Sequence, residues 1–352
     1  MGDTTFEIRF LAEVVKTPSP SGSEDAATTL LATRLKDLGW DTVERDEVGN
    51  VVASRGRGQK ELILLGHIDT VQGGPQFRLD NGTMHGRGTV DAKGPLCALA
   101  VAGALVEVSH EWKVTLIAAV GEEKDSRGAR HRVALHCPSA CIVGEPTGTD
   151  GIALAYRGRV LARLFSKDGG AHRSWSPGPP TAVVLAAAEI LREVGINKSA
   201  YGISSRNSGA VLSMHGEEAM GRSAELFLDI RVAASHTQES LADLAMGICK
   251  RHGVSAEILD SVPYHGVNTS DPVVGAIRNA LCRSGTRPRL LRKSGTSDFN
   301  TVASWGCPMA VYGPGRSELE HTSEEQIETA DYIKSIAILE RAITNIFHMN
   351  RI

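Results

Sequence analysis

Short apolar runs alternate with helical patterns over the first third of the chain. Residues 6–15 and 26–38 carry apolar side chains at helical spacing and predict two amphipathic helices. A third helical run covers 95–108. Continuous apolar runs, which are typical of strands buried on both faces, stand at 61–67, 113–123 and 139–146. This alternation predicts an α/β fold, with a mixed, largely parallel sheet and helices on both of its faces.

A different pattern begins at about residue 156 and ends near residue 264. Its elements follow the order strand, helix, strand, strand, helix, strand, at 156–167, 181–195, 209–214, 223–232, 239–252 and 254–262. Such a unit forms a small antiparallel sheet with two helices on one face. We therefore predict an inserted α+β domain at 156–264, within a main domain made of residues 1–155 and 265–352.

The α/β alternation resumes after the insertion, with a helix predicted in 271–285 and strands at 287–293 and 307–313. The last helix is predicted at 323–347, with Thr322 or the next residue as its cap and acidic residues at 324 and 325 in its first turn. Ser21 and Glu24 have the spacing of a capping box before the second helix.

Composition narrows the class of protein. The chain has 352 residues, a formal net charge of -3 and 22% charged residues, which argues against a general nucleic-acid coat or an acidic tail. Its length predicts about two domains. We find no apolar run of the roughly 18 residues that a membrane span needs. The first ten residues show neither a basic start nor an apolar core, so no export signal is visible and we expect a cytoplasmic protein.

The cysteines are scattered, which disfavours a disulfide framework in a chain without an export signal. They stand at Cys97, Cys137, Cys141, Cys249, Cys282 and Cys307. The pair at 137 and 141 has no second pair at zinc-finger spacing. We expect all six to be small, buried, apolar side chains.

Each of the three strand-like runs ends in residues that could bind a metal or transfer a proton. They are His67 and Asp69, then Glu122 and Glu123, then Glu145. In parallel sheets, ligands collect at the carboxyl ends of the strands. Two adjacent carboxylates are costly unless a cation or a proton lies between them. A pair of metal ions would supply that cation, with one carboxylate as ligand and the other as general base. The alternatives are a satisfied turn at 67–69 and a solvated acidic turn at 122–123.

Two further positions extend this set. Asp91 stands between glycines in HGRGTVDAKGPL (85–96), just before a helix, where it could also be a helix cap. His321 precedes the predicted last helix, and we can assign it no structural role. Histidines and carboxylates without cysteine suit zinc, cobalt or manganese in a paired site.

The order of these motifs resembles the M20 metallopeptidase and deacylase family, which includes carboxypeptidases, acetylornithine deacetylase and succinyl-diaminopimelate desuccinylase. The motifs are GHIDTV (66–71), GRGTVDAKGPL (86–96), GEEKDSRG (121–128), VGEPTG (143–148) and HT (321–322). The resemblance covers essentially the whole chain. It implies that the inserted domain serves as a lid or as the surface of a homodimer.

The resemblance also implies a role for each motif residue. One divalent ion would be held by His67, Asp91 and Glu145, and a second by Asp91, Glu123 and His321, so that Asp91 bridges them. The ions would be zinc, with cobalt or manganese as alternatives. Asp69 would orient His67, and Glu122 would be the base that deprotonates the attacking water and then protonates the leaving amine.

In the inserted domain, the resemblance implies two residues that act on the substrate. His172 in GGAHRS would steady the oxyanion of the tetrahedral intermediate, and Arg231 in LFLDIRV would bind a substrate carboxylate. An ordinary loop histidine is the alternative for His172. The chain departs from the family near Glu218, where many relatives carry Asn.

Three segments look most like the branch that hydrolyses lysine or ornithine conjugates of an amino-group carrier protein. They are DAKGPL (91–96), KSGTSDFN (293–300) and YGPGRSELEHT (312–322). This implies an amide hydrolase that releases the amino acid from the C-terminal glutamate of a small acidic carrier, in lysine or arginine biosynthesis. Ser294, Gly295 and Thr296 would contact the substrate, or else form a loop that caps a helix.

The segment CRSGTRPRLLRK (282–293) carries five basic residues and no acid. It could steer an acidic protein partner, or it could be a solvated edge strand whose charges deter aggregation. Two other functions stay open: a small-molecule deacylase or dipeptidase with the same metal residues, and a non-catalytic relative that binds a partner. A non-catalytic relative should have lost a ligand or the base, and this chain has kept all of them.

Overall fold

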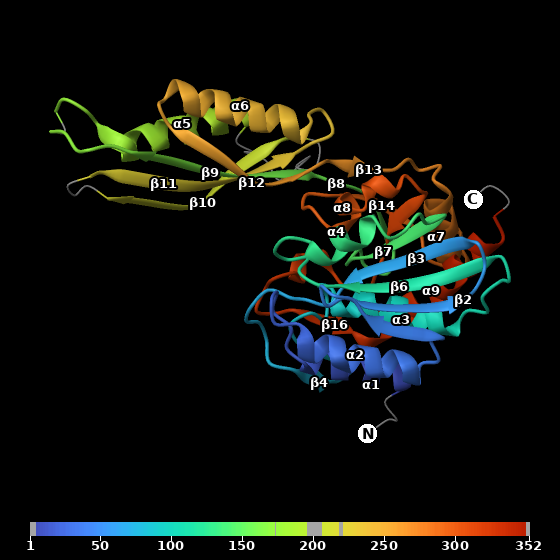
Figure 1. Ribbon diagram of the computed structural model, residues 1–352. Coiled ribbons are helices and arrows are strands. Elements are labelled where there is room, and N and C mark those ends of the chain that lie inside the picture. Colours follow the sequence, from blue (N-terminus) through green and yellow to red (C-terminus); the bar gives the residue numbers. More distant parts are fainter. Residues whose placement is uncertain (1–4, 173, 196–205, 218–220, 350–352) are drawn as a thin grey trace. The chain divides into compact units, whose positions relative to one another are not determined.

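The computed structural model describes residues 5–172, 174–195, 206–217 and 221–349 (Figure 1). The chain divides into two compact units. The first consists of Met1–Leu154, Val267–Leu291 and Thr301–Ile352, and the second of Ala155–Gly266 and Arg292–Asn300. No helix in the described ranges is long and apolar enough to cross a membrane.

The first unit is built on a mixed sheet with a parallel centre. The strand order is β1 (Thr42–Arg45), β2 (Val51–Gly56), β6 (Trp112–Ala119), β3 (Lys60–His67), β7 (Ala140–Gly144), β15 (Met309–Val311) and β8 (Gly151–Tyr156), with β14 (Arg289–Lys293) paired to β8. The central strands β6, β3, β7 and β15 run parallel to one another, and the flanking pairs are antiparallel. The predicted α/β class is confirmed, and its parallel part is the centre of the sheet.

Helices cover this sheet because its strands are apolar on both faces. The helices of the unit are α1 (Phe6–Lys16), α2 (Asp25–Asp37), α3 (Lys93–Leu105), α4 (Arg127–Val133), α7 (Pro272–Arg283) and α9 (Thr329–Phe347). Leu62 and Leu64 of β3 share one core with α1, α2, α3, α7 and α9. Ile63 and Leu65, which point the other way, are also fully buried. Both faces of β3 are therefore covered, as its unbroken apolar run predicts.

A small antiparallel sheet lies in the same unit. It pairs β16 (Gln326–Glu328) with β5 (Thr83–His85) and β5 with β4 (Arg78–Asp80). Short 3-10 helices stand at Ala303–Trp305 and Ser317–Leu319. The sheet ties the segment before α9 to the segment before α3.

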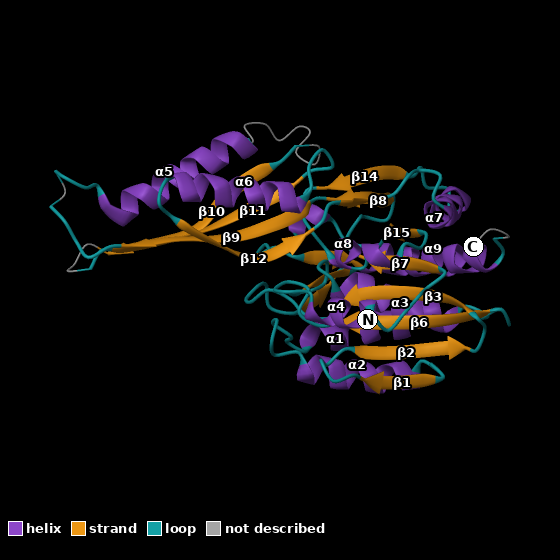
Figure 2. Ribbon diagram, turned by 45° about the horizontal axis from the view of Figure 1, so that its top comes forward, coloured by secondary structure: helices purple, strands orange, loops and turns teal. Residues whose placement is uncertain are grey.

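The second unit is a four-stranded antiparallel sheet with two helices on one face (Figures 1 and 2). Its strands are β10 (Ser208–Glu217), β11 (Ser223–Val232), β9 (Gly158–Lys167) and β12 (Ser255–Val262), in that order, and its helices are α5 (Gly178–Val194) and α6 (Gln238–Arg251). Alternate residues Val160, Ala162 and Leu164 of β9 are buried in the core shared with both helices. The short strand β13 (His265–Gly266) pairs with residues 155 and 156, and a short helix, α8, covers Asp298–Thr301.

The structure corrects the predicted start of the last helix. It begins at Thr329, not at 323, because residues 326–328 form strand β16 against β5. Glu325, expected in the first helical turn, is instead fully buried. The exposed Glu324 precedes the strand as well. Residues 326–328, which read as helix, are held extended by a tertiary strand pairing, which sequence periodicity does not report.

The other predicted caps are also absent. The cap position of α2 is Glu24, whose side chain makes no cap hydrogen bond and instead pairs with Arg127 at 2.8 Å. The hydroxyl of Ser21 donates to Asp69. The cap position of α3 is Ala92, so Asp91 is not its cap. Polar residues that could have capped helices are used for tertiary contacts.

The cysteines are free thiols, and only part of the prediction for them holds. Cys97, Cys141 and Cys249 are buried, Cys307 is half-buried, and Cys137 and Cys282 are exposed. Burial raises the pKa of Cys249 to about 11 and keeps that thiol protonated. The expectation that all six are buried is therefore wrong for Cys137, which lies after α4, and for Cys282, which lies in the last turn of α7.

Candidate metal centre

Three neighbouring parallel strands bring the predicted ligands to one edge of the sheet. His67 ends β3, and Glu122 and Glu123 follow β6 within four residues. Glu145 directly follows β7. In register, His67 stands opposite Ala119, and the residue before it stands opposite the last residue of β7. The strands therefore end together, and their polar end residues meet.

Asp91 lies between the two histidines. Its Oδ1 is 3.2 Å from Nε2 of His67, and its Oδ2 is 3.1 Å from Nε2 of His321. Nε2 of His321 is also 2.9 Å from Oε1 of Glu123. Glu145 completes the first group, since ligand atoms of His67, Asp91 and Glu145 all lie within 4.8 Å of one another. The ligand atoms of Asp91, Glu123 and His321 form a second such group.

The chemistry of these donors fits a pair of divalent cations. Three carboxylates and two imidazoles converge. The side chains of Asp91 and Glu123, which contact His321, are only 11% and 9% exposed. Buried carboxylates at this density need positive charge beside them. Oxygen and imidazole ligands without thiolate suit zinc, cobalt or manganese. A carboxylate with one oxygen toward each group, as in Asp91, is suited to bridge two ions.

The raised pKa values of the two histidines also indicate that the site needs positive charge. Hydrogen bonds with Asp91 and Glu123 raise the pKa of His321 to about 10. Burial lowers the pKa of His67, but the nearby carboxylates of Asp69 and Asp91 outweigh burial and raise the pKa well above its ordinary value. Protons on the imidazoles thus balance the carboxylates, and divalent cations could replace them.

Glu122 lies beside the two groups rather than within either of them. One of its carboxylate oxygens is 3.9 Å from Nε2 of His67. Ligand atoms of His67, Glu122 and Glu123 also come within 4.8 Å of one another. A carboxylate at this distance could accept a proton from a water molecule placed between the ions.

Asp69 holds the loop that carries both glutamates. Its carboxylate accepts the backbone N–H groups of Glu122 at 3.0 Å and Glu123 at 3.2 Å, and the hydroxyl of Ser21 at 2.6 Å. Nδ1 of His67 lies 3.0 Å from the backbone carbonyl of Asp69 and 3.6 Å from its carboxylate. Asp69 therefore contacts the histidine mainly through its main chain, and its carboxylate positions the next loop.

Sequence reasoning did not find two residues of this region. Ser21 was assigned to a helix cap, and nothing in its neighbourhood points to Asp69, 48 residues away. Glu325 was assigned to a helical turn, and it binds the backbone of residues 88–91. Contacts between segments far apart in sequence leave no periodic signal.

The residues predicted to contact substrate lie in the second unit. His172 is on an exposed loop, where its Nδ1 is 2.7 Å from the hydroxyl of Ser174. Arg231 of β11 pairs with Asp229 at 2.9 Å, and its guanidinium donates to the hydroxyl of Thr296 at 3.1 Å. Position 218, where the chain departs from the family, lies outside the described residues.

The loop before α8 shows the capping turn, one of its two predicted uses, and its contact with substrate stays a prediction. The hydroxyl of Thr296 donates to the carbonyl of Arg157, and the carbonyl of Ser294 accepts from the Arg157 guanidinium. Gly295 has open space around it. The hydroxyl of Ser297 accepts the N–H of Phe299, as in a capping turn.

Part of the basic stretch is already paired. Arg289 forms a double hydrogen bond with Asp150, and Arg292 donates to the phenol of Tyr264.

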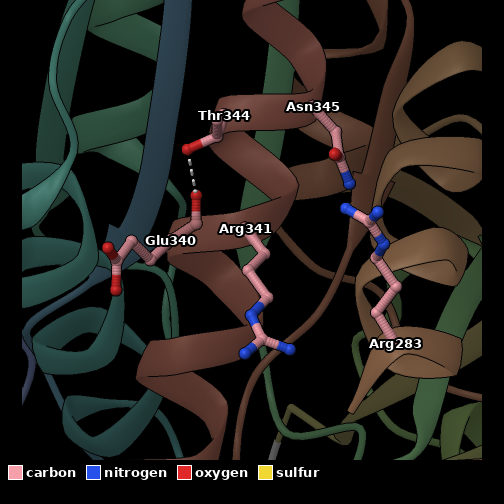
Figure 3. A pocket seen from close by; sticks show the side chains of 5 residues that line it. All are labelled: Arg283, Glu340, Arg341, Thr344 and Asn345. Carbon is pink, nitrogen blue, oxygen red and sulfur yellow. Dashed lines mark hydrogen bonds between the residues drawn. The ribbon is translucent and has the colours of Figure 1, made fainter.

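A polar groove of about 460 Å³ lies between α7 and α9 (Figure 3). Arg283, the last residue of α7, and Arg341 of α9 point into it. The other lining residues are Glu340, Thr344 and Asn345. Within the described ranges, neither Arg283 nor Arg341 forms an ion pair.

Comparison with known proteins identifies the family. Residues 63–345 match the model of peptidase family M20/M25/M40. The chain belongs to this family. Among its relatives are a LysW-lysine hydrolase from Deinococcus radiodurans, 32% identical over 96% of both chains, and a LysW-lysine/LysW-ornithine hydrolase from Saccharolobus solfataricus, 30% identical over 90% of this chain and 89% of the relative.

Solved structures of family members share the fold. An M20 metallo-carboxypeptidase from Sulfolobus solfataricus superposes with a TM-score of 0.80 at 17% identity, covering 98% of this chain and all of the other. A dinuclear metal-binding M20 peptidase from Bacillus subtilis gives a TM-score of 0.66 at 17% identity, covering 96% and 97%. Membership of this family and the clustered ligands support bound divalent metal ions in this chain.

Proposed function

We propose that this chain is a metal-dependent amide hydrolase that releases lysine or ornithine from the C-terminal glutamate of an amino-group carrier protein. The observation that carries the hydrolase activity is Asp91, whose two carboxylate oxygens face the two histidines. The relatives named as LysW-lysine or LysW-ornithine hydrolases support the choice of substrate, because they match over nearly the whole chain. An acidic carrier is the expected protein partner.

The proposed metal ligands divide into two sets that share one residue. His67, Asp91 and Glu145 would hold one divalent ion, and Asp91, Glu123 and His321 the other. We propose zinc, since imidazole and carboxylate ligands suit it, with cobalt or manganese as alternatives. Bound ions would polarise the scissile carbonyl and make a water molecule easier to deprotonate.

Glu122 is the proposed base. It would take a proton from the attacking water and deliver it to the nitrogen of the leaving amino acid, so that the amide bond breaks without expelling an amide anion. Its place next to His67, with its backbone N–H fixed by Asp69, supports this role. Asp69 thus positions the base, and its own carboxylate does not need to reach the substrate.

The second unit is proposed to supply substrate contacts. His172 would donate to the oxyanion, and its exposure on a loop leaves its ring accessible. Arg231 would bind a substrate carboxylate, for which that carboxylate must share the guanidinium with Asp229. The loop of Ser294, Gly295 and Thr296 would line the same region of the unit, since Thr296 contacts Arg231.

The same unit is proposed to form a homodimer. Its edge strand β10 is exposed along most of its length, and it presents Val211, Leu212 and Met214 to solvent at 44%, 55% and 44% exposure. Val184 and Leu185 of α5 are exposed as well. An apolar edge strand beside an apolar helix face favours pairing with a second copy of the chain.

The proposed substrate is tested by comparing two amides. Purified zinc-loaded enzyme should release lysine or ornithine from the carrier conjugate with a kcat/KM at least about 100-fold above that for free acetylornithine. Equal or better hydrolysis of acetylornithine would favour the small-molecule deacylase instead. Either outcome leaves the proposed metal site unchanged, so the test addresses the substrate alone.

The proposed base is tested by Glu122→Gln. We expect kcat to fall by about 100- to 10,000-fold, because the amide cannot accept the proton, while the zinc content stays at that of the wild type. Elemental analysis of the same sample separates loss of the base from loss of metal. Full activity in this variant would remove Glu122 from the mechanism.

A further inference from the structure

A buried carboxylate next to the metal centre belongs to neither proposed ligand set. Glu325 is fully buried and lies four residues after His321. Burying a carboxylate is costly unless hydrogen-bond donors or cations surround it. Its partners therefore show which part of the fold requires it.

Glu325 faces the backbone of the loop that leads into Asp91. Its Oε1 accepts the N–H groups of Gly88 and Val90 at 2.9 Å each, and that of Asp91 at 3.1 Å. Its Oε2 accepts from the guanidinium of Arg87 at 2.5 Å. One side chain thus satisfies three backbone donors and a cation, and it fixes the peptide groups just before the proposed bridging residue.

Further hydrogen bonds join the same two segments. The N–H of Gly86 donates to the carbonyl of Glu325, and Arg87 donates to the carbonyl of Thr322, both at 3.2 Å. Strand β16 then continues the contact by pairing with β5. The segment that carries His321 and the segment that carries Asp91 are therefore connected on both sides of Glu325.

The position of His321 depends on this connection because the residue has a strained backbone conformation on a half-exposed segment. Its side chain is 48% exposed, and its backbone φ of 59° lies in the left-handed region. A non-glycine residue there is strained and persists only where neighbouring structure holds it. The contacts of Thr322 and Glu325 with the opposite segment supply that support.

We propose that Glu325 is a positioning residue that holds Asp91 and His321 in place relative to each other, so that metal affinity depends on it although it binds neither ion. This inference rests on the metal site of the proposed function. It assigns Glu325 no contact with the substrate and no part in proton transfer. Loss of its carboxylate acts on the ligands through the backbone of residues 86–91.

The test is Glu325→Gln, with Glu324→Gln as its matched control. Glutamine keeps the size of the side chain, but its amide group cannot accept from both the three N–H groups and Arg87. The exposed neighbour Glu324 loses the same charge without any of these contacts. Apparent dissociation constants for Zn²⁺, measured without substrate by competition with a chromophoric chelator, should rise about 10- to 100-fold for Glu325→Gln and stay unchanged for Glu324→Gln.

Wild-type zinc affinity in folded Glu325→Gln protein, or an equal loss in the control, would overturn the proposal. Amide hydrogen exchange on the zinc-loaded wild type provides a second measurement that needs no variant. The amides of residues 86–91 should exchange slowly, and exchange as fast as in the exposed loop at 72–74 would equally overturn it. Both readouts are independent of hydrolysis, so a wrong assignment of the substrate leaves them interpretable.

Discussion

Ser21 and Asp69 show how a single hydroxyl can restrain the loop that carries Glu122 and Glu123. Asp69 is fully buried, and its carboxylate accepts two backbone N–H groups in addition to the hydroxyl of Ser21. The serine bond is the shortest of the three. It binds Oδ2, the oxygen that also accepts the N–H of Glu123, so rotation of the Asp69 carboxylate away from the loop is opposed.

We predict that Ser21→Ala loosens this loop without removing a ligand. Loss of a hydrogen bond to a charged group should cost about 1.5–3 kcal/mol, seen as a melting temperature lower by several degrees. At saturating zinc, kcat should fall about 3- to 10-fold because Glu122 is held less precisely. Ser23→Ala is the control, since Ser23 is exposed and no hydrogen bond of its hydroxyl is found in the described part of the chain. Equal kcat values for the two variants would contradict the prediction.

At the residue scale, the candidate ligands could be predicted and their supports could not. His67, Glu123 and Glu145 follow apolar strands, and residue type combined with strand ends is visible in a sequence. Ser21 and Glu325 look like ordinary helix-capping residues. Their partners lie 48 and 234 to 237 residues away, and only the folded backbone brings them within reach.

At the scale of elements, the strands of the main sheet follow directly from their apolar runs. Strands β3, β6 and β7 lie where those runs predict them, because burial on both faces requires continuous apolar residues. The start of α9, in contrast, does not follow from the sequence pattern. Residues 326–328 contain Ile327, which is buried in the main core from an extended backbone. Helical and extended conformations both bury that side chain, and the partner strand β5 decides between them.

The second residue of strand β3 is a glutamate whose charge contributes to stability. Glu61 accepts from the hydroxyl of Thr115 at 2.6 Å, and it pairs with His136 at 3.0 Å and Lys113 at 3.1 Å. Burial raises the pKa of Glu61, but the hydrogen bonds with His136 and Thr115 outweigh it and lower the pKa to about 2. The carboxylate is therefore more strongly favoured in the folded than in the unfolded chain.

The pKa of Glu61 predicts a pH-dependent part of the stability. Since the folded pKa lies below the unfolded one, the contribution is complete above the unfolded value of about 4.5 and is lost as the pH falls toward 2. It should amount to about 3 kcal/mol at pH 7. We expect Glu61→Gln to lower the melting temperature at pH 7, and the difference from the wild type to shrink at pH 3.5. Glu111→Gln, an exposed glutamate before the neighbouring strand, should change little at either pH.

At the scale of the whole molecule, the burial pattern of the second unit differs from that of the main unit. Strand β9 alternates buried and half-exposed residues over most of its length, whereas the last six residues of β3 are all buried. A change from continuous to alternating burial marks the passage from a covered sheet to one with a single helical face. The sequence does not distinguish a lid from a dimer surface, since both consist of exposed residues.

The exposed edge of the second unit leads to a prediction about assembly. If β10 pairs with β10 of another copy across a two-fold axis, two four-stranded sheets become one, and Leu212 of each copy enters the shared surface. Leu212→Asp then places two charges in that surface. Since each buried charge costs at least about 1.5 kcal/mol, the dimer dissociation constant should rise about 100-fold or more.

Sedimentation velocity at micromolar concentration would measure this change. The wild type should sediment as a dimer and Leu212→Asp as a monomer. Leu135→Asp is the matched control, because Leu135 is 56% exposed, against 55% for Leu212, but belongs to the first unit. It should remain dimeric. A monomeric wild type, or a dimer that survives Leu212→Asp, would mean that the apolar side chains of β10 serve something other than self-association. Because the proposed metal ligands all lie in the first unit, zinc affinity should be the same in all three proteins.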